Sequence, residues 1–428
     1  MKRRGFLTRA LGATAATSAL AASVGCAGVP RGARPQVVVV GGGFGGATAA
    51  KYLRLWSAGT IDVTLVEPAP AFVSCPVSNL VVAGLKTLDD ITLPFDTLVQ
   101  RHGVRWRREV ATAIDLDTRE LRLTGGNRLR CDRLVLSPGV ALMSSAIPGL
   151  PAAQAEGRVL HAWKAGPETT ALHRQLQALP PGGVFAITIP LAPYRCPPGP
   201  YERASLVADW LGRHNPRAKV LVLDANDDVV SKAALFKQAW AELHAGRIEY
   251  RPQHVLAGVD GARGLLRFEV QDDVRADVLN VLPPMRAGAI AVQAGLATVN
   301  QRWCPVDFLT FASVHAPGVH VLGDAIQAAP QMPKSGHMAN NHAKVAAAAI
   351  VAELAGLPPP PEPMLTNACY SLVSADQAIH VASVHRYDAA ARTFNLVPGS
   401  GGVSAARSAQ EVRLAEAWAR NTWADMLV

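Results

Sequence analysis

Three glycines and one acid have the types and the spacing that a dinucleotide-binding site requires. Gly41, Gly43 and Gly46 follow a run of valines in a G-x-G-x-x-G pattern. In such a pattern the first glycine permits the turn out of a strand, the second admits a pyrophosphate, and the third lets the next helix pack closely. Glu67 lies about 20 residues further on, where an acid that binds a ribose hydroxyl is expected. These residues predict a nucleotide-cofactor site.

Cysteines are the second set of residues that could do chemistry. The chain has six of them, namely Cys26, Cys75, Cys131, Cys196, Cys304 and Cys369. Leaving out Cys26, which lies in the N-terminal segment, an odd number remains, so one is free, modified or paired outside the chain. Cys131 and Cys304 lie beside predicted strands and are expected to be buried and inert. Cys75 lies in a predicted loop over the dinucleotide, or is a small buried side chain.

A βαβ unit must position the glycines and Glu67. Residues 37–40 predict a buried parallel strand, residues 47–55 a helix and residues 62–66 a second strand. Residues 132–139 predict a short strand that returns to the same sheet. This order of elements is the context that the glycine pattern requires.

A later segment, GVHVLGDA at residues 318–325, predicts a strand that ends at Gly323 and Asp324. An acid at such a strand end can hydrogen-bond a flavin ribityl hydroxyl. The next segment, 332–341, leads into a helix predicted from His342 to Leu354. The helix N-terminus would lie against the flavin pyrimidine, where negative charge collects on reduction.

A second βαβ unit is predicted from a strand at 184–189, a helix at 201–213 and a strand at 219–223. Its loop reads PLAPYRCPPGP and has no glycine trio to admit a pyrophosphate. The unit is therefore expected to lack a nicotinamide site and to present Cys196 on a rigid loop. The residues leave a purely structural disulfide at Cys196 open, while the Pro-rich loop favours a redox role.

Composition and the N-terminus restrict the class of protein. The 428 residues are 49% hydrophobic and 18% charged, which predicts a globular chain of several domains. Arg3 and Arg4 precede an apolar stretch, as in a twin-arginine export signal, so residues 1–34 predict a periplasmic protein. No later apolar run is long enough to span a membrane. The formal charge of +9 is scattered and does not support nucleic-acid binding.

The expected fold is α/β, with two Rossmann-like nucleotide-binding-type domains and a C-terminal α+β region. A first part of an FAD-binding domain is predicted at 35–155 and the second nucleotide fold at 156–285. The second part of the FAD-binding domain is predicted at 286–356, and an interface region at 357–428. No C-x-x-C-H haem-attachment motif is present in the sequence.

Several stretches resemble the flavoprotein subunit of flavocytochrome c sulfide dehydrogenase over nearly the whole mature length. They include VVVVGGGFGGATAAKYL, SCPVSNLV, YRCPPGPYERAS, WCPVDFLTFAS, GVHVLGDA, MPKSGHMANNHAKVAAAAIV and TNACYSLV. The wider group contains sulfide:quinone oxidoreductases and has a glutathione-reductase-like fold. The segment before Cys75 departs from the family pattern, because Phe72 and Val73 stand where tyrosine is common.

The resemblance implies a role for each matching residue. Cys75 matches the cysteine that binds FAD covalently through a thioether, and Cys196 and Cys369 match a redox-active disulfide. Lys334 matches a lysine near the flavin pyrimidine, and Asp324, after Gly323, matches the ribityl-binding acid. The remaining cofactor-binding positions are those of the adenine half, Gly41, Gly43, Gly46 and Glu67.

The function that the resemblance implies is oxidation of hydrosulfide to sulfane sulfur. Electrons would pass through the disulfide and FAD to a separate c-type cytochrome subunit. Two alternatives remain open, namely a sulfide:quinone oxidoreductase and a non-catalytic, flavin-bearing thiol–disulfide sensor. His161, His337 and His342 are each an open candidate for a proton carrier.

Overall fold

The structure is a computed structural model that describes residues 34–428. Residues 35–428 form one compact unit. The predicted export signal lies in residues outside the described part of the chain. Among the described helices, none combines the length and the apolar character that crossing a membrane would require.

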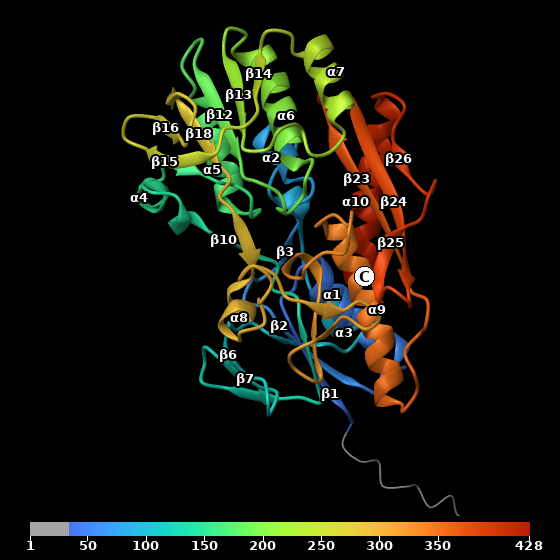
Figure 1. Ribbon diagram of the computed structural model, residues 1–428. Coiled ribbons are helices and arrows are strands. Elements are labelled where there is room, and N and C mark those ends of the chain that lie inside the picture. The colour runs from blue at the N-terminus through green and yellow to red at the C-terminus, as the bar shows by residue number, and fades with distance from the viewer. Residues whose placement is uncertain (1–33) are drawn as a thin grey trace, which may run out of the picture. The chain divides into compact units, whose positions relative to one another are not determined.

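A seven-stranded sheet carries the glycine-rich segment at the end of one of its interior strands (Figure 1). Its first strand, β1 (Gln36–Val40), pairs in parallel with β2 and β9, and all four of its valines are buried. β22 extends the sheet in parallel beside β9, although it is distant in sequence. The strands in spatial order are β20 (Val306–Asp307), β21 (Ala312–Ser313), β22 (Val319–Val321), β9 (Arg133–Leu136), β1, β2 (Asp62–Val66) and β5 (Arg105–Arg107).

Two helices from distant parts of the chain pack together beside this sheet. α1 (Phe44–Trp56) and α9 (Gly336–Leu354) are rich in alanine, which permits close approach, and they contact one another along their length. A buried hydrogen bond of 2.9 Å from Asn340 to Thr48 joins them. The C-terminal helix α10 (Ala409–Leu427) accepts hydrogen bonds from Lys51 of α1.

A second, parallel sheet is formed by residues between the two parts of the first. Its order is β11 (Val159–Leu160), β18 (Val278–Val281), β12 (Val184–Ile189), β13 (Lys219–Asp224) and β14 (Ile248–Arg251). Buried, β-branched runs form its central strands, as expected of a sheet that is covered on both faces. The helices of this unit are α5 (Pro167–Gln177), α6 (Gly199–His214) and α7 (Ala233–Leu243).

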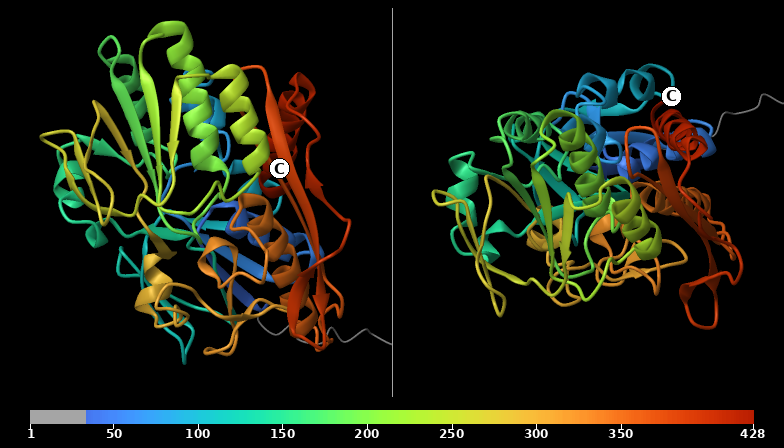
Figure 2. Two further views of the ribbon diagram at one scale, coloured as in Figure 1. Left: turned by 45° about the horizontal axis from the view of Figure 1, so that its top comes forward. Right: turned by 90° about the horizontal axis from the view of Figure 1, so that it is seen from above.

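The C-terminal region adds an antiparallel sheet, coloured red in Figure 2. Its strands are β23 (Met364–Leu372), β24 (Ala378–Asp388), β25 (Thr393–Leu396) and β26 (Gly402–Val403). β23 contacts both α9 and α6, so it touches the FAD-type unit and the second unit together. The remaining short elements are β3 (Phe72–Val73), α2 (Ser78–Val82), β4 (Thr92–Leu93), α3 (Asp96–Gln100), β6 (Ala111–Asp115), β7 (Glu120–Leu123), β8 (Arg128–Arg130), β10 (Val140–Leu142), α4 (Leu150–Ala155), β15 (Leu256–Asp260), β16 (Leu265–Phe268), β17 (Val274–Arg275), β19 (Met285–Ala287), α8 (Ala289–Gln293), and the 3₁₀ turns η1 (Asp89–Ile91), η2 (Ser144–Ala146) and η3 (Gly323–Ala325).

The prediction that a helix begins at His342 is wrong, because α9 begins six residues earlier, at Gly336. The Ser335 side chain caps this start by accepting a hydrogen bond of 3.1 Å from the Met338 amide. The α/β fold class is confirmed by the two parallel sheets and the C-terminal antiparallel region.

Candidate functional site

A cavity of about 730 Å³ lies at the carboxyl end of β1, within the range that small-molecule and cofactor sites occupy. Its walls come from the glycine loop, the turn after β9, the N-terminus of α9, β23 and α10. The sequence-predicted site residues among its lining are Gly41, Gly43, Glu67, Cys75, Cys196, Gly323, Asp324 and Cys369. Segments that are far apart in sequence therefore meet at one cavity.

The three glycines have the separate roles that their spacing predicts. Gly41 has a φ of +98°, and a side chain there would meet the Ser137 carbonyl oxygen at 2.3 Å. At Gly46 a Cβ would lie 1.7 Å from the Gly41 carbonyl oxygen, so the helix and the loop could not approach as they do. Gly43 has open space where its Cβ would be and faces the cavity. The loop can therefore bring backbone amides to a pyrophosphate.

Glu67 lies directly after β2, and its side chain is hydrogen-bonded to the glycine loop. Its carboxylate accepts hydrogen bonds of 2.7 Å from the Gly42 amide and 2.8 Å from the Ala69 amide. Glu67 also lines the cavity. One acid thus braces the glycine loop and faces the place where a ribose would bind.

Asp324 gives the strongest single indication that the cavity is a ligand-binding site. It follows Gly323, which has a φ of +73°, in the η3 turn after β22. Its Oδ1 atom is buried and has no hydrogen-bond partner. Burial raises the pKa of this carboxyl, while Arg195 and Lys334 oppose the rise. An unpaired acceptor in a cavity wall fits a ligand hydroxyl, because a buried polar group is costly without a partner.

These features together fit FAD. Gly43 gives room for the pyrophosphate, Glu67 lies near the adenosine end, and Asp324 offers an acceptor for the ribityl chain. The N-terminus of α9, at Gly336, points its free amides at the cavity, where they favour negative charge.

Cys75 lies in the loop after β3, half-buried in the cavity wall. The neighbouring Ser74 accepts a hydrogen bond of 3.1 Å from the Trp423 indole nitrogen, and the Cys75 carbonyl accepts one of 2.7 Å from Ser78. The loop is thereby tied to α10 and to α2. Cys75 is a free thiol at the position where the sequence predicts flavin attachment.

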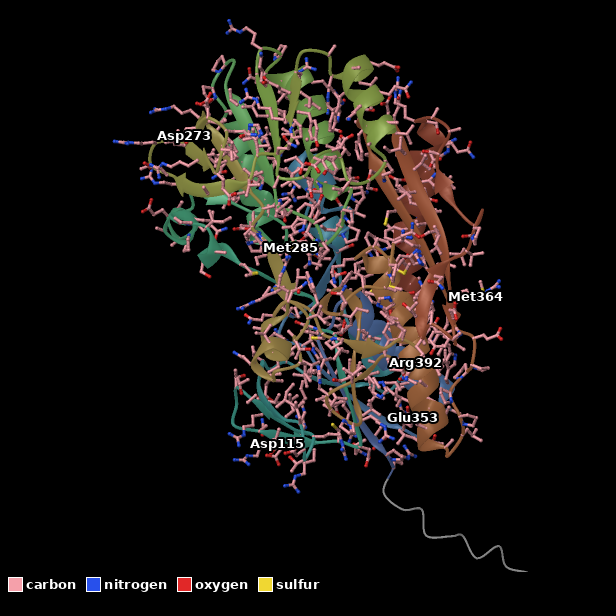
Figure 3. All side chains as sticks on the ribbon, in the orientation of Figure 1. Asp115, Asp273, Met285, Glu353, Met364 and Arg392 are labelled. Atoms are coloured by element: carbon pink, nitrogen blue, oxygen red, sulfur yellow. The ribbon has the colours of Figure 1, made fainter. Side chains whose placement is uncertain are left out.

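Cys196 is held by its backbone in a conformation that few residues adopt. Its φ is +58°, which is costly for a residue with a Cβ. Its amide donates a 2.8 Å hydrogen bond to the Lys334 carbonyl, and its own carbonyl accepts one of 2.9 Å from Gly199. The preceding amide, of Arg195, donates to the sulfur of Met285 at 3.4 Å; Met285 is labelled in Figure 3. The loop between β12 and α6 therefore presents this thiol in a fixed direction.

Cys369 comes to the same cavity from β23. It and Cys196 are both free thiols in the structure, and Cys369 adds to the rise in the pKa of Cys196. Burial raises the pKa of both. Cys369 also lines a second cavity of about 660 Å³, which Cys196 does not line. Of the two thiols, Cys369 therefore stands in a wall shared by both cavities.

The other cysteines lie as the sequence predicts. Cys131 and Cys304 are buried, and burial raises the pKa of the Cys131 thiol to about 11 and that of Cys304 to about 12. Neither lines the large cavity.

Lys334, which the resemblance places near the flavin pyrimidine, is held beside the Asp324 turn. Its ammonium donates hydrogen bonds of 3.0 Å to the Asp324 carbonyl and 2.5 Å to the Ile326 carbonyl, and it lies 3.7 Å from the centre of the Trp303 ring. The residue lines the second cavity but not the large one. Burial lowers the pKa of Lys334 to about 8. Its side chain supports the Asp324 turn, and its carbonyl positions Cys196.

Four further residues at the site carried no signal in the sequence. Arg195 lines the cavity and lies within electrostatic reach of Cys75 and Asp324. The carboxylate of Glu202 accepts hydrogen bonds of 2.8 Å from Asn79 and 2.9 Å from Leu372, and burial raises its pKa. Lys232 lies buried beside Cys369. Trp423, from α10, also lines the cavity.

The second unit has lost the features of a nucleotide site. Asp224 ends β13 as Glu67 follows β2, but it is fully buried. Its carboxylate accepts hydrogen bonds of 2.7 Å from Tyr201 and 3.1 Å from Tyr250. Both tyrosines bond to Oδ2, and the backbone and side-chain amides of Asn226 donate to Oδ1, so neither oxygen is left for a ribose.

Of the three proposed proton carriers, two have fixed roles in packing. The Gly323 amide donates to Nδ1 of His342, and burial lowers the pKa of that imidazole to about 3. The Ala368 amide donates at 3.0 Å to Nδ1 of His337, which lines the cavity, and burial lowers its pKa also. His161 lies 2.8 Å from Glu168 and is not among the cavity residues.

Three family models match the chain. "Sulfide dehydrogenase [flavocytochrome c] flavoprotein chain, central" matches residues 169–283. "Flavocytochrome c sulphide dehydrogenase, flavin-binding" matches residues 361–427. "Pyridine nucleotide-disulphide oxidoreductase" matches residues 35–177.

Individual relatives agree with these matches. The mitochondrial sulfide:quinone oxidoreductase of Dictyostelium discoideum is 25% identical over 297 residues, which cover 68% of this chain and 65% of that protein, less than two thirds of its length. The solved structure of the sulfide:quinone oxidoreductase from Aquifex aeolicus has a TM-score of 0.76 at 19% identity and covers 92% of this chain and 91% of its own. That likeness is one of fold.

A third relative is a flavoprotein chain of flavocytochrome c sulfide dehydrogenase from Chlorobaculum thiosulfatiphilum. It is 67% identical over 46 residues, which are 11% of this chain and 94% of that sequence. Together with the central and flavin-binding matches, this identity shows that the chain belongs to the flavoprotein chains of flavocytochrome c sulfide dehydrogenase.

Proposed function

We propose that the protein oxidises sulfide to sulfane sulfur through a disulfide between Cys196 and Cys369 and a bound FAD. The observation that carries the proposal is that both thiols line the same cavity as the glycine loop, Glu67 and Asp324. They come from different units, Cys196 from the loop before α6 and Cys369 from β23. Neither a structural core disulfide nor a nicotinamide site requires that convergence.

The chemical step is a thiol–disulfide exchange. Hydrosulfide attacks one sulfur of the disulfide, and the sulfur–sulfur bond of the protein breaks as a new one forms. One cysteine becomes a persulfide and the other a thiolate, so the sulfide sulfur is oxidised by two electrons and the disulfide is reduced by two. The protein contributes the fixed direction of Cys196, set by the Lys334 carbonyl, and the burial that excludes other nucleophiles.

FAD, when bound, supplies an acceptor that takes two electrons and releases them singly. Gly43, Glu67 and Asp324 would hold it, and Cys75 would attach it covalently. The N-terminus of α9 would stabilise negative charge on its ring. The acid of the second unit, Asp224, offers no oxygen to a cofactor, because Tyr201, Tyr250 and Asn226 occupy its carboxylate.

The electron acceptor that we propose is a separate c-type cytochrome in the periplasm. Two features support it, the absence of a haem-attachment motif from the sequence and the twin-arginine pattern at Arg3 and Arg4. The family name, which contains a cytochrome, agrees with this partner.

An anaerobic sulfide titration tests the proposal. Near-stoichiometric sulfide should bleach the flavin absorbance, and cytochrome c added afterwards should become reduced. Cys196→Ser should abolish bleaching by sulfide while dithionite still bleaches the flavin. Cys304→Ser is the control, because that cysteine is buried outside the large cavity.

Two outcomes would contradict the proposal. A flavin that sulfide does not bleach would favour a thiol–disulfide sensor. Oxidation of the reduced flavin by quinone but not by cytochrome would favour a sulfide:quinone oxidoreductase.

Covalent attachment is tested separately. Trichloroacetic acid precipitates the protein and releases flavin that is bound without a covalent bond. We expect the flavin of the native chain to stay with the pellet and that of Cys75→Ser to enter the supernatant. Release of flavin from the native chain would show that Cys75 lies beside FAD without bonding to it.

A further inference from the structure

A buried lysine beside the two thiols has no part in the function proposed so far. Lys232 immediately precedes α7, and its backbone has a φ of +57°. Figures 1 and 2 show α7 lying next to β23, the strand that carries Cys369. The lysine comes from the second unit and reaches across to the C-terminal sheet, as Cys196 does.

The Lys232 ammonium is fixed by hydrogen bonds. It donates one of 3.0 Å to the Cys369 carbonyl and one of 2.8 Å to the Ser371 hydroxyl, and only 7% of the residue is exposed. A flexible side chain is therefore held at one place beside the thiol-bearing residue. Burying a cation is costly, so a nearby negative charge would repay part of that cost.

Charged groups around the ammonium come from three elements. Cys369 on β23, Cys196 and Glu202 from the loop and start of α6, and Glu411 on α10 all favour its protonated form. Burial, which is the larger effect, lowers the pKa of Lys232 to about 8. At neutral pH the residue is therefore still mostly protonated.

Lys232 acts more strongly on Cys369 than on Cys196. Burial raises the pKa of Cys369, and Lys232 gives the largest opposing effect, ahead of Asn367 and Ser335, while Glu202 adds to the rise. For Cys196 the opposing cation is first Arg195 and then Lys232. The lysine is thus the principal positive charge for the thiol on β23.

We propose that Lys232 is a positioning residue that stabilises the thiolate of Cys369 when the disulfide opens. The inference rests on the proposed function. Hydrosulfide then adds to Cys196, the Cys196–Cys369 bond breaks, and its electron pair goes to Cys369 as thiolate beside the ammonium. Cys196 becomes the persulfide, and charge is conserved because one anion is consumed and one is formed. A better-stabilised thiolate leaves faster, so the lysine directs which sulfur is attacked.

The test measures the thiol rather than turnover. The flavin-bearing protein is reduced with a phosphine and alkylated with iodoacetamide at pH 7, where Lys232 is mostly protonated, and peptide mass spectrometry follows Cys369. Lys232→Gln removes the charge and keeps an N–H donor. We expect it to slow Cys369 alkylation at least tenfold at this pH, equivalent to about 1.4 kcal/mol.

Two matched variants separate charge from structure. Lys232→Arg keeps the positive charge and should restore the alkylation rate at pH 7 to within twofold of the native rate. Ser371→Ala removes one hydrogen-bond acceptor and keeps the ammonium, so its rate should equal that of the native chain. A native rate in Lys232→Gln would overturn the inference, as would an equal slowing in Ser371→Ala. If Lys232→Gln does not retain flavin, Lys232→Met provides the same comparison.

A second readout separates this inference from the proposed function. After one equivalent of sulfide, mass spectrometry should find the extra sulfur on Cys196 in the native chain. Sulfur on Cys369 instead would overturn the inference while leaving sulfide oxidation intact. If sulfide adds to neither cysteine, the proposed function fails. The alkylation rates at pH 7 still report whether Lys232 stabilises the Cys369 thiolate.

Discussion

The β1–α1 and β12–α6 segments are the same strand–loop–helix arrangement, and their loops differ in composition. The first has Gly41, Gly43 and Gly46, and the acid beyond it faces a cavity. The second has prolines around Cys196, and the carboxylate of its acid, Asp224, is occupied by Tyr201, Tyr250 and Asn226. The comparison shows how one topology supplies a glycine loop for a nucleotide in one copy and places a thiol in the wall of the same cavity in the other. What changes is the loop, while the sheet stays parallel and buried.

The largest expected effect follows from the closest approach in the first loop. Gly46→Ala would place a Cβ 1.7 Å from the Gly41 carbonyl oxygen, so the strand and helix must separate. We expect loss of bound flavin and a fall of about 3 kcal/mol or more in the free energy of unfolding. The control in the second unit is Gly212→Ala on α6, where the nearest atoms belong to the flexible Arg247 guanidinium at 3.3 Å. Equal losses in both variants, measured by flavin absorbance and denaturation, would contradict the comparison.

The acids of the two units should differ in what they support. Asp324→Ala removes the unpaired buried acceptor and should weaken FAD binding about 10- to 100-fold, the worth of a hydrogen bond to a charged group. Asp224→Ala removes the acceptor that the Tyr201 and Tyr250 hydroxyls share and should lower stability by about 2 kcal/mol without changing flavin affinity. Fluorescence titration in a Cys75→Ser background makes the binding reversible. A lower flavin affinity in Asp224→Ala would contradict this distinction between the two acids.

The buried lysine of the first unit predicts a dependence on pH. Burial lowers the pKa of Lys334 from its ordinary 10.5 to about 8, so between those values the unfolded chain holds more protons at this residue than the folded one. The free energy of unfolding therefore rises with pH in this range through Lys334. Relative to Lys334→Met, the native chain should gain about 2 kcal/mol between pH 8 and pH 10. Urea denaturation measures it, with the exposed Lys237→Met as control, and a constant difference would show that Lys334 does not titrate there.

The smallest expected effect is none at all. NADH should not reduce the flavin, because the second loop has no glycines to admit a pyrophosphate. Dithionite is the positive control, since it needs no binding site. Anaerobic bleaching of the flavin by NADH would show that the second unit binds a nucleotide by another route.

The parts of the site that can be predicted from sequence are those formed by residues close together in the chain. The glycine loop with Glu67 and the turn at Asp324 each follow one buried strand, so strand, turn and side chain are read together. Lys232 and Glu202 have no such signal, because their approach to Cys369 depends on how α6 and α7 pack against β23. No local pattern specifies that packing.

The early start of α9 was missed for a different reason. Gly336, Asn340 and Asn341 have low helix propensity, which favoured a later start. Packing outweighs that preference, since Asn340 bonds to Thr48 of α1 and the Asn341 side chain bonds to the His337 carbonyl. The hydrogen bond from the Met338 amide to the Ser335 side chain stabilises this earlier start.

The position of Cys369 between two cavities has a kinetic consequence. Because the second cavity reaches Cys369 without passing the glycine loop, a small molecule can approach this residue without sharing an opening with a large bound cofactor. The rate at which the small molecule exchanges and the time for which the cofactor stays bound then depend on different residues. Substitutions at Val381 or Leu396, which line the second cavity, can alter the first rate without changing the walls that retain the cofactor.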